Sequence, residues 1–452
     1  MTQTLETNLP RKYSQVQSSN LLFYGLLIYT VIFYSQLGSR FPTLAPFRPE
    51  FTIGTLLLIA IFFKIFNNEL DIRQNGINGA AIFFLVSALI TIPFAFVKSR
   101  ALFSFLSLLK FCSIYLMIIS AIDSENKLKT FMYVYLASIS LLFVQPFLLS
   151  LQGKGFIQAA GVMRLQGITG YFAHPNQLGG ITAANLPYFY YFMRYEKSRA
   201  AKVIFFLLII VGLRVIMLTQ SRTAFVGVFS FAFLVWLFGK RKLLGLAIGL
   251  VSCIVLWHVA PEQTKYRFRS LASTTYVLSV DRSELTEEEL QQVSSMASRW
   301  TLIKRGLIAF SENPFLGLGL NCFPSFNGQR WGLWFPPHNT YVQALAEMGL
   351  VGFTAFCFFI FTIFRNLKVA GRLVERTGVP DNFLRSMISA VIVYLLTRLA
   401  VSLFGQDLYG NYWWVAAGLS VVILRIIKMD SQNQSDKNMK SAEVIALCPL
   451  SS

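Results

Sequence analysis

His338 is the residue of this sequence whose type and surroundings best suit acid–base chemistry. It follows Pro336-Pro337 and precedes an apolar run that starts at Tyr341, so its imidazole would lie at the mouth of a helix. An imidazole titrates near neutral pH and can accept the proton of an attacking hydroxyl group. The alternative is a histidine that only caps the helix or lies at a membrane interface.

Polar side chains continue from His338 into the apolar run. Asn339, Gln343 and Glu347 are spaced by four residues, which places them on one face of a helix. A polar stripe on an otherwise apolar helix must face the protein interior. Glu347 could orient His338 from this stripe, although the simpler interpretation is that Glu347 only completes the stripe.

Cations also occur where the surrounding sequence is apolar. Lys110, Arg214 and Arg398 lie in such runs. A charge inside a bilayer costs roughly 2.5–3.5 kcal/mol on insertion scales, so it usually faces an internal cavity. Arg214 and Arg222 would share a face if one helix ran through both positions. Snorkelling of the long side chain to an interface is the alternative for Arg214 and Arg398.

An anion is the ligand that these charges would suit. The outer loops assigned below hold few acidic residues, and the sequence has no Asp-x-Asp pair, so arginine would have to neutralise a diphosphate. The three histidines and five cysteines match no metal or disulfide spacing, so no metal or other cofactor is expected. Gly317-Leu318-Gly319 is interpreted as a turn, because it lacks the strand and third glycine of a nucleotide loop.

Composition indicates an all-α integral membrane protein. Of the 452 residues 55% are hydrophobic and only 13% are charged, whereas soluble domains carry roughly 25% charged residues. Apolar runs of about 20 residues recur along the chain, which is the length of a helix that crosses a bilayer. The formal net charge of +19 is explained by basic cytoplasmic loops rather than by nucleic-acid binding.

About twelve transmembrane helices position the polar residues. The predicted spans are 21–39, 51–66, 79–97, 101–121, 129–150, 177–193, 203–219, 223–239, 243–260, 341–364, 384–404 and 411–427. The basic loops after the sixth, eighth, tenth and twelfth spans all fall on one side, which is therefore predicted to be cytoplasmic. Both termini share that side, with a cytoplasmic N-terminal tail at 1–20 and a disordered tail at 429–452.

A long extracytoplasmic loop at 261–340 separates helices 1–9 (21–260) from helices 10–12 (341–428). Thr286 and Glu289 have the spacing of a capping box at a helix start, and Asn313-Pro314 would end that helix. Trp300, Ile303, Leu307 and Phe310 share one face of it. Long loops with their own helices are usually functional.

Taken together, these segments resemble the O-antigen ligase and O-antigen polymerase superfamily. The resemblance rests on motifs between about 165 and 352. They are Ser298-Arg299-Trp300, Asn313-Pro314-Phe315-Leu316-Gly317-Leu318-Gly319, Pro337-His338-Asn339-Thr340-Tyr341, Glu347-Met348-Gly349-Leu350-Val351-Gly352, Thr219-Gln220-Ser221-Arg222, and Arg164 with Pro175-Asn176.

The resemblance implies a metal-independent, inverting glycosyltransferase with a GT-C-like helical bundle in the bacterial inner membrane. Its donor would be a glycan on undecaprenyl diphosphate at the periplasmic face, and its acceptor lipid A–core or another glycan. By position, Arg222 and Arg299 match the arginines that hold the diphosphate, and His338 matches the essential histidine. Second-line candidates for contact with the glycan or phosphate are Arg164, Asn176 and Arg214, and Asn339 and Glu347 are secondary site residues.

Other functions stay open at this point. A polymerase that joins lipid-linked repeat units, or an enzyme that couples glycans to a protein or another lipid, would show the same motifs. A polysaccharide or lipid transporter is the alternative of another class, although the sequence lacks the repeated halves that transporters often show. These motifs do not identify the sugar, the acceptor or the oligomeric state.

Overall fold

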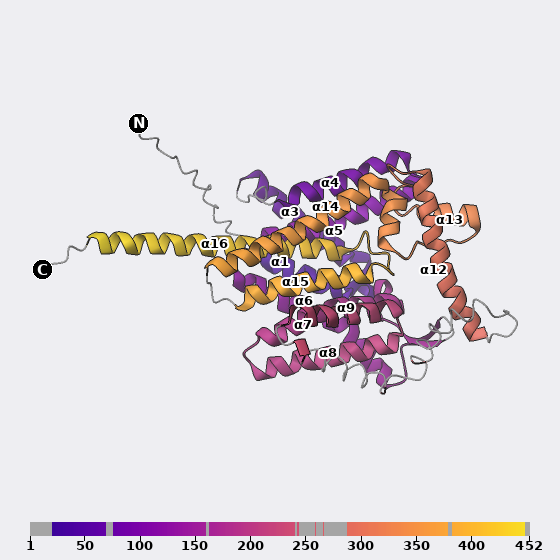
Figure 1. Cartoon of the computed structure of the whole chain (residues 1–452), viewed down its shortest axis with the longest axis horizontal. Coiled ribbons are helices and arrows are strands. Elements are labelled where there is room, and N and C mark those ends of the chain that lie inside the picture. Colours follow the sequence, from indigo (N-terminus) through magenta and orange to yellow (C-terminus); the bar gives the residue numbers. More distant parts are fainter. Residues whose placement is uncertain are drawn as a thin grey trace.

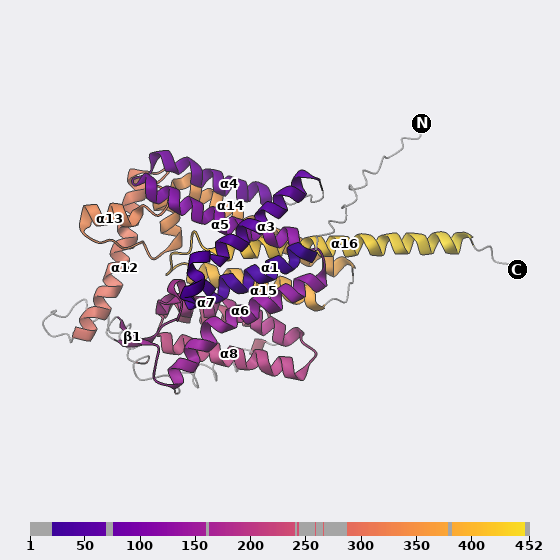
Figure 2. The same cartoon turned by 180° about the vertical axis from the view of Figure 1, so that it is seen from behind.

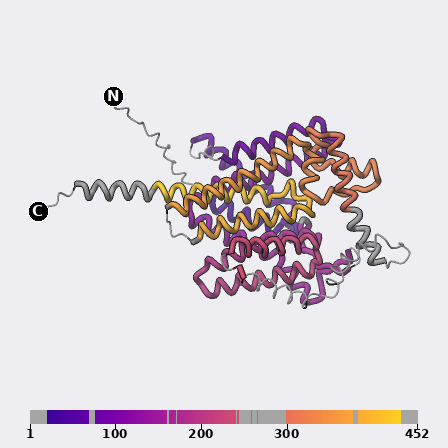
Figure 3. Tube along the Cα trace, viewed as in Figure 1, coloured from indigo at the N-terminus to yellow at the C-terminus, as the bar shows by residue number. Residues whose placement is uncertain are grey.

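A computed structural model describes residues 20–68, 76–159, 162–239, 242–243, 258, 265, 287–377 and 382–447. Its long helices run lengthwise through one bundle (Figure 1, Figure 3). They are α1 (Asn20–Ser35), α3 (Pro49–Phe66), α4 (Ile77–Thr91), α5 (Lys98–Ala121), α6 (Glu125–Leu151), α7 (Pro175–Tyr195), α8 (Arg199–Thr219), α9 (Arg222–Phe238), α14 (Thr340–Thr377), α15 (Asn382–Val401) and α16 (Asn411–Leu447).

The all-α membrane architecture predicted from composition is confirmed. Within the described residues, eight helices are long and apolar enough to cross a membrane, and α1 and α9 are shorter apolar helices. Each predicted span except the one at 243–260 coincides with a described helix, although α7, which matches the span 177–193, is less apolar and is not among these ten. That ninth span lies almost wholly outside the described residues, so the count of twelve stays a prediction.

The predicted tenth span is broken by a glycine. Gly349 has φ 62° and ψ −165°, which lies outside the helical region, so α14 consists of two helical parts that meet there. The backbone of the Pro314–Gly319 turn satisfies groups on both sides of the break. Leu318 N–H donates to Ala346 O at 2.9 Å, and Leu350 N–H donates to Pro314 O at 2.8 Å. Irregular backbone is tolerated at membrane depth when other protein groups supply its hydrogen bonds.

The first and last predicted spans also differ from the structure. The first is divided at Gln36, whose left-handed backbone (φ 51°) ends α1 and starts the short α2 (Leu37–Arg40). The disordered tail predicted from Met429 is wrong as far as Leu447, because α16 continues to that residue. The segment from Leu419 to Leu447 contains neither glycine nor proline, so nothing in it interrupts the helix.

Helix α7 packs against α8, α9 and α15. Most of its side chains are buried, including Thr182 and Asn185. Gly179 permits the closest approach, because a Cβ atom there would lie 2.8 Å from Thr219 Oγ1 and 2.9 Å from Ala224 Cβ. Small residues of this kind let membrane helices approach closely. The starts of α7 and α9 are thereby held together.

One end of the bundle carries the remaining elements. The antiparallel hairpin β1 (Phe156–Ala159) and β2 (Val162–Leu165), together with α12 (Glu287–Glu312) and α13 (Phe323–Trp331), lie at the end opposite the C-terminus of α16 (Figure 1, Figure 2). Helix α12 starts and ends close to the predicted positions. The face that carries Trp300 and Leu307 is exposed at these two residues, and Leu302 and Ala309 on another face are buried.

Candidate active site

Arg164 connects three segments at this end of the bundle. It lies on β2 and is 5% exposed. Its Nε donates to Thr219 O at 2.9 Å, and its Nη2 donates to Asn176 Oδ1. Burial, followed by the positive charges of Arg299 and Arg222, lowers the pKa of Arg164 to about 10. The hairpin, the start of α7 and the α8–α9 turn are therefore tied together by one guanidinium group.

The α8–α9 turn places Arg222 next to this group. Gln220 adopts a left-handed conformation (φ 49°) that ends α8, and Ser221 Oγ caps α9 by accepting from Ala224 N–H at 3.3 Å. Arg222 is the first residue of α9. Since α8 ends at Thr219, no single helix runs through Arg214 and Arg222, so the condition under which they would share a helical face is not met.

His174 is a site residue that the sequence analysis did not single out. It is the N-cap of α7, and its Nδ1 accepts a hydrogen bond from Asn176 N–H at 3.1 Å. The proton of the neutral ring must then reside on Nε2. Burial and the charges of Arg164 and Arg299 lower the pKa of His174. His174 is therefore a neutral hydrogen-bond donor beside the arginines.

Arg299 reaches the cluster from α12. Gly306, seven residues further on and thus on the same helical face, lies so close to α14 that a Cβ atom there would be 2.4 Å from Val342 Cγ1. This contact turns the Arg299 face of α12 toward the start of α14. Burial lowers the pKa of Arg299, and its charge influences Arg164, Arg222, His174 and His338.

His338 lies directly before α14 in a left-handed conformation (φ 51°). Histidine is among the few non-glycine residues enriched in this region, and such backbone conformations cluster at functional sites. Burial, then the charges of Arg299 and His174, lower the pKa of His338 to about 4. At neutral pH its imidazole is therefore uncharged and has a lone pair available to accept a proton.

Asn339 and Glu347 have structural contacts in the described chain. Asn339 Oδ1 caps α14 by accepting from Tyr341 N–H and Val342 N–H, each at 3.0 Å. Glu347 is fully buried and accepts from Tyr409 Oη at 2.8 Å and from Gln343 Nε2 at 3.1 Å. The Glu347 carboxylate therefore bonds to these two side chains and not to His338. This agrees with the simpler interpretation of the sequence, in which Glu347 only completes the polar stripe.

The three cations singled out within apolar runs lie apart from the interactions of this cluster. Arg398 is buried and forms an ion pair with Asp407 at 2.9 Å, with its guanidinium 3.5 Å from the centre of the Tyr412 ring. Arg214 is partly buried on α8, and its Nη1 has no hydrogen-bond partner among the described residues. Lys110 lies on α5 with its ammonium 5.7 Å from the centre of the Phe33 ring.

Five side chains thus form one electrostatically coupled group, which we call the arginine–histidine cluster: Arg164, His174, Arg222, Arg299 and His338. Within the described residues, and apart from burial, the groups that shift the pKa values of these residues are other arginines and histidines of the cluster, and no carboxylate is among them. Helices α7 and α9 also begin here, and a helix N-terminus attracts anions. The arrangement suits a ligand with two or more negative charges, next to a neutral imidazole that can accept a proton.

Comparison with known proteins gives two matches. Residues 188–357 match the family model described as O-antigen ligase, a range that includes Arg222, Arg299 and His338. A protein of Rickettsia conorii that carries the provisional name polysaccharide ligase is 24% identical over 200 residues, which are 40% of this chain. The match spans 45% of the length of that relative. By the family match, the helical membrane bundle and the motifs placed within it, the chain is similar to the O-antigen ligase superfamily over residues 188–357.

Proposed function

We propose that the protein transfers a glycan from undecaprenyl diphosphate to a hydroxyl group of lipid A–core, with inversion at the anomeric carbon and without a metal. The observation that carries the proposal is the arginine–histidine cluster, which brings cations for a diphosphate next to a neutral imidazole. The similarity of residues 188–357 to the O-antigen ligase family supports the reaction class. The donor, the acceptor and the stereochemistry are proposals.

In the proposed step, the acceptor oxygen attacks the anomeric carbon on the face opposite the diphosphate. The bond between this carbon and the diphosphate oxygen breaks, and undecaprenyl diphosphate leaves with the bonding electrons. Arg222 and Arg299 stabilise the negative charge that grows on the leaving oxygen. The proton of the acceptor hydroxyl passes to the imidazole of His338.

Binding of the donor would also prepare His338 for this role. With the ligand absent, neighbouring positive charge and burial lower the pKa of His338 to about 4, which makes it a weak base. A bound diphosphate would offset the positive charge of Arg299 and so raise the pKa of His338. The base would therefore be strongest when the donor is in place.

The other members have supporting roles in the proposal. Arg164 holds Asn176 and the Thr219 carbonyl and adds positive charge beside the phosphates. His174 donates from Nε2 to a phosphate or sugar oxygen. Arg214, whose Nη1 is buried without a hydrogen-bond partner in the described chain, is a second-line contact for the glycan.

We further propose that the cluster lies on the periplasmic side of the inner membrane and that both termini are cytoplasmic. Helices α7 and α14 begin near the cluster and end at basic residues, Arg194 for α7 and Arg376 for α14. Basic residues at the ends of spans are typical of the cytoplasmic side. This polarity supports the assignment.

Deletion of the gene and complementation with wild type or His338→Ala would test the proposal. Surface glycans and the lipid-linked pool are compared on gels. A ligase leaves long glycans on undecaprenyl diphosphate and bare lipid A–core in the deletion strain, and only the wild type restores transfer. Accumulation of single repeat units would instead indicate a polymerase, and two unchanged pools would contradict glycan transfer altogether.

A further inference from the structure

Lys110 is an intramembrane cation that the proposed glycan transfer does not use. It lies near the middle of α5, about 18 Å from the first residue of that helix at 1.5 Å per residue. The surrounding helix is apolar enough to cross a membrane. An ionised side chain at such a position is costly unless it meets a polar partner, so its surroundings indicate its role.

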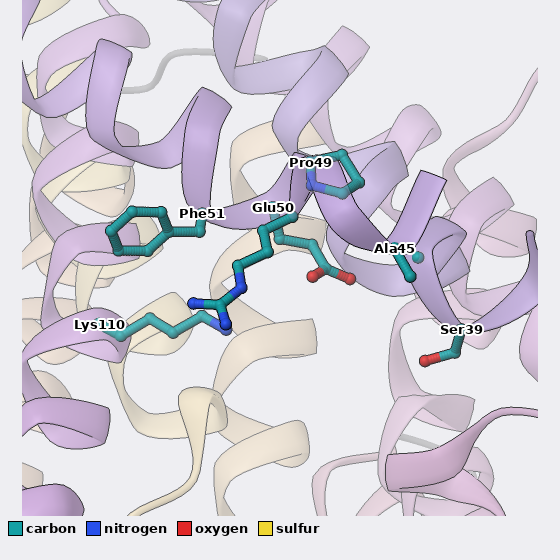
Figure 4. A pocket seen from close by; sticks show the side chains of 8 residues that line it. Ser39, Ala45, Pro49, Glu50, Phe51 and Lys110 are labelled. Carbon is teal, nitrogen blue, oxygen red and sulfur yellow. The ribbon is translucent and has the colours of Figure 1, made fainter. Parts of the chain in front are cut away.

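Lys110 lines a pocket with a volume of about 390 Å³ on the side of the bundle. The opposite wall is formed by α2, by the 3₁₀ helix η1 (Pro42–Phe47) and by the first residues of α3. Figure 4 shows the Lys110 side chain reaching in from α5 and the Ser39 hydroxyl pointing in from the far side, with the Glu50 carboxylate between them. None of these elements supplies a residue to the arginine–histidine cluster.

The pocket holds charges of both signs. Arg48 and Lys110 supply two cations and Glu50 one carboxylate. Within the described residues, none of the three forms an ion pair or a hydrogen bond with another side chain, although the pocket brings them to one space. Arg48 is held at the junction of η1 and α3 by a left-handed backbone (φ 43°). Charged groups that line one space without satisfying one another suit a ligand that carries both signs.

The rim of the pocket includes the apolar side chain of Phe51. Phe47 and Phe51 flank Arg48 and are 71% and 66% exposed. Their exposed rings lie on the outside of a bundle whose exterior faces lipid, where acyl chains can pack against them. A ligand with a charged head and attached acyl chains would therefore satisfy both the interior and the rim.

We propose that this pocket binds the headgroup of a zwitterionic aminophospholipid of the phosphatidylethanolamine type. The phosphodiester lies between Arg48 and Lys110, and the primary ammonium donates to Glu50 and Ser39. The acyl chains run along Phe47 and Phe51. The site is separate from the proposed donor site and stands whether or not the protein transfers glycans.

Native mass spectrometry of the full chain, titrated with defined lipids, tests the site. One phosphatidylethanolamine should bind more tightly than phosphatidylglycerol or phosphatidylcholine. Lys110→Gln and Arg48→Gln should each weaken it about tenfold, as expected for loss of a charge-assisted hydrogen bond. Lys98→Gln, on the same helix but outside the pocket lining, should have no effect, and Lys110→Arg should retain binding.

Glu50→Gln tests recognition of the ammonium group separately from recognition of the phosphodiester. It should weaken phosphatidylethanolamine while leaving the affinity for phosphatidylglycerol unchanged. Equal binding of all three phospholipids in wild type and variants would overturn the proposal. So would displacement of the bound lipid by an excess of inorganic phosphate, or preferential occupation of the pocket by undecaprenyl diphosphate, because the pocket would then recognise phosphate alone.

Discussion

Arg164, Arg222 and Arg299 are close enough for positive charge to lower the pKa of neighbouring groups. Arg222 also begins α9, where the helix dipole disfavours a cation. The ligand-free protein therefore carries an unfavourable electrostatic energy that an anion would remove. Such an arrangement is costly for stability and is expected where charge binds a substrate.

The two histidines of the cluster should differ in their effect on transfer. His338→Ala should reduce kcat by a factor of about 10²–10⁴, the usual contribution of a general base. His174→Asn keeps an N-cap for α7 but loses the Nε2 donor, so we expect a loss of about tenfold, mainly in KM. Transfer assays in membranes would measure both. His258→Ala, which changes a histidine that is not a member of the cluster, is the control. Near-full activity of His338→Ala would exclude the base assignment.

The pKa of His338 gives a second prediction. Because this pKa is lowered to about 4, His338 should remain neutral at pH 5–7 and titrate only below that range. Arg299→Gln removes a neighbouring positive charge, so the pKa of His338 should rise toward its ordinary value of 6.5. NMR titration of labelled histidines in detergent would measure the shift, and a wild-type value near 6.5 would contradict the buried cationic environment.

The same shift fixes the sign of its effect on stability. An unfolded chain would bind a proton at His338 below about pH 6.5, whereas the folded chain binds it only near pH 4. The contribution of His338 to stability is thus fully present above pH 6.5 and is lost as the pH falls toward 4.

Hydropathy predicted the helices well because each apolar run must be helical in a bilayer. It did not predict the breaks, since Gln36 and Gly349 lie inside continuous apolar runs. The break at Gly349 depends on hydrogen bonds to Pro314 and Phe315, which are distant in the sequence and come from another segment. The sequence likewise did not predict the ion pair of Arg398 with Asp407 or the hydrogen bond of Glu347 with Tyr409, because no sequence pattern links these residues.

Gly349 should be essential for the fold of α14. A Cβ atom there would lie 2.3 Å from the Phe315 carbonyl group, and its φ and ψ are nearly restricted to glycine. Gly349→Ala should destabilise the protein by about 3 kcal/mol or more. Gly371→Ala in the same helix, where a Cβ meets nothing within 4 Å, should be neutral or slightly stabilising. Thermal unfolding in detergent would compare them, and equal melting temperatures would show that the break is not required.

Five segments meet in the cluster because the hairpin, the start of α7, the α8–α9 turn, α12 and the start of α14 share one end of the bundle (Figure 1). Counting spans predicted that Arg222, Arg299 and His338 lie on one side. It did not predict that His174 joins them, since a His-Pro-Asn sequence also fits an ordinary turn. The contacts of Arg164 with Thr219 and Asn176 are tertiary and have no sequence pattern of their own.

Anion binding should be visible as a change in the stability of the whole chain. Inorganic pyrophosphate should raise the melting temperature more than sulfate at equal ionic strength, because only the former matches a diphosphate site. Arg299→Gln should raise the melting temperature of the ligand-free protein by roughly 1–3 °C and abolish the pyrophosphate effect. Lys304→Gln, also on α12, is the control. A lower melting temperature for Arg299→Gln with the pyrophosphate effect intact would contradict the repulsive cluster.

Helix α16 has a consequence for measuring orientation. Its 37 residues extend about 55 Å, well beyond the roughly 30 Å of hydrocarbon, and its free end points away from the arginine–histidine cluster (Figure 1). A fluorescent or enzymatic reporter fused after Ser452 would therefore lie beyond the lipid headgroups. It would report the compartment at one end of the molecule while leaving the chemistry at the other end undisturbed.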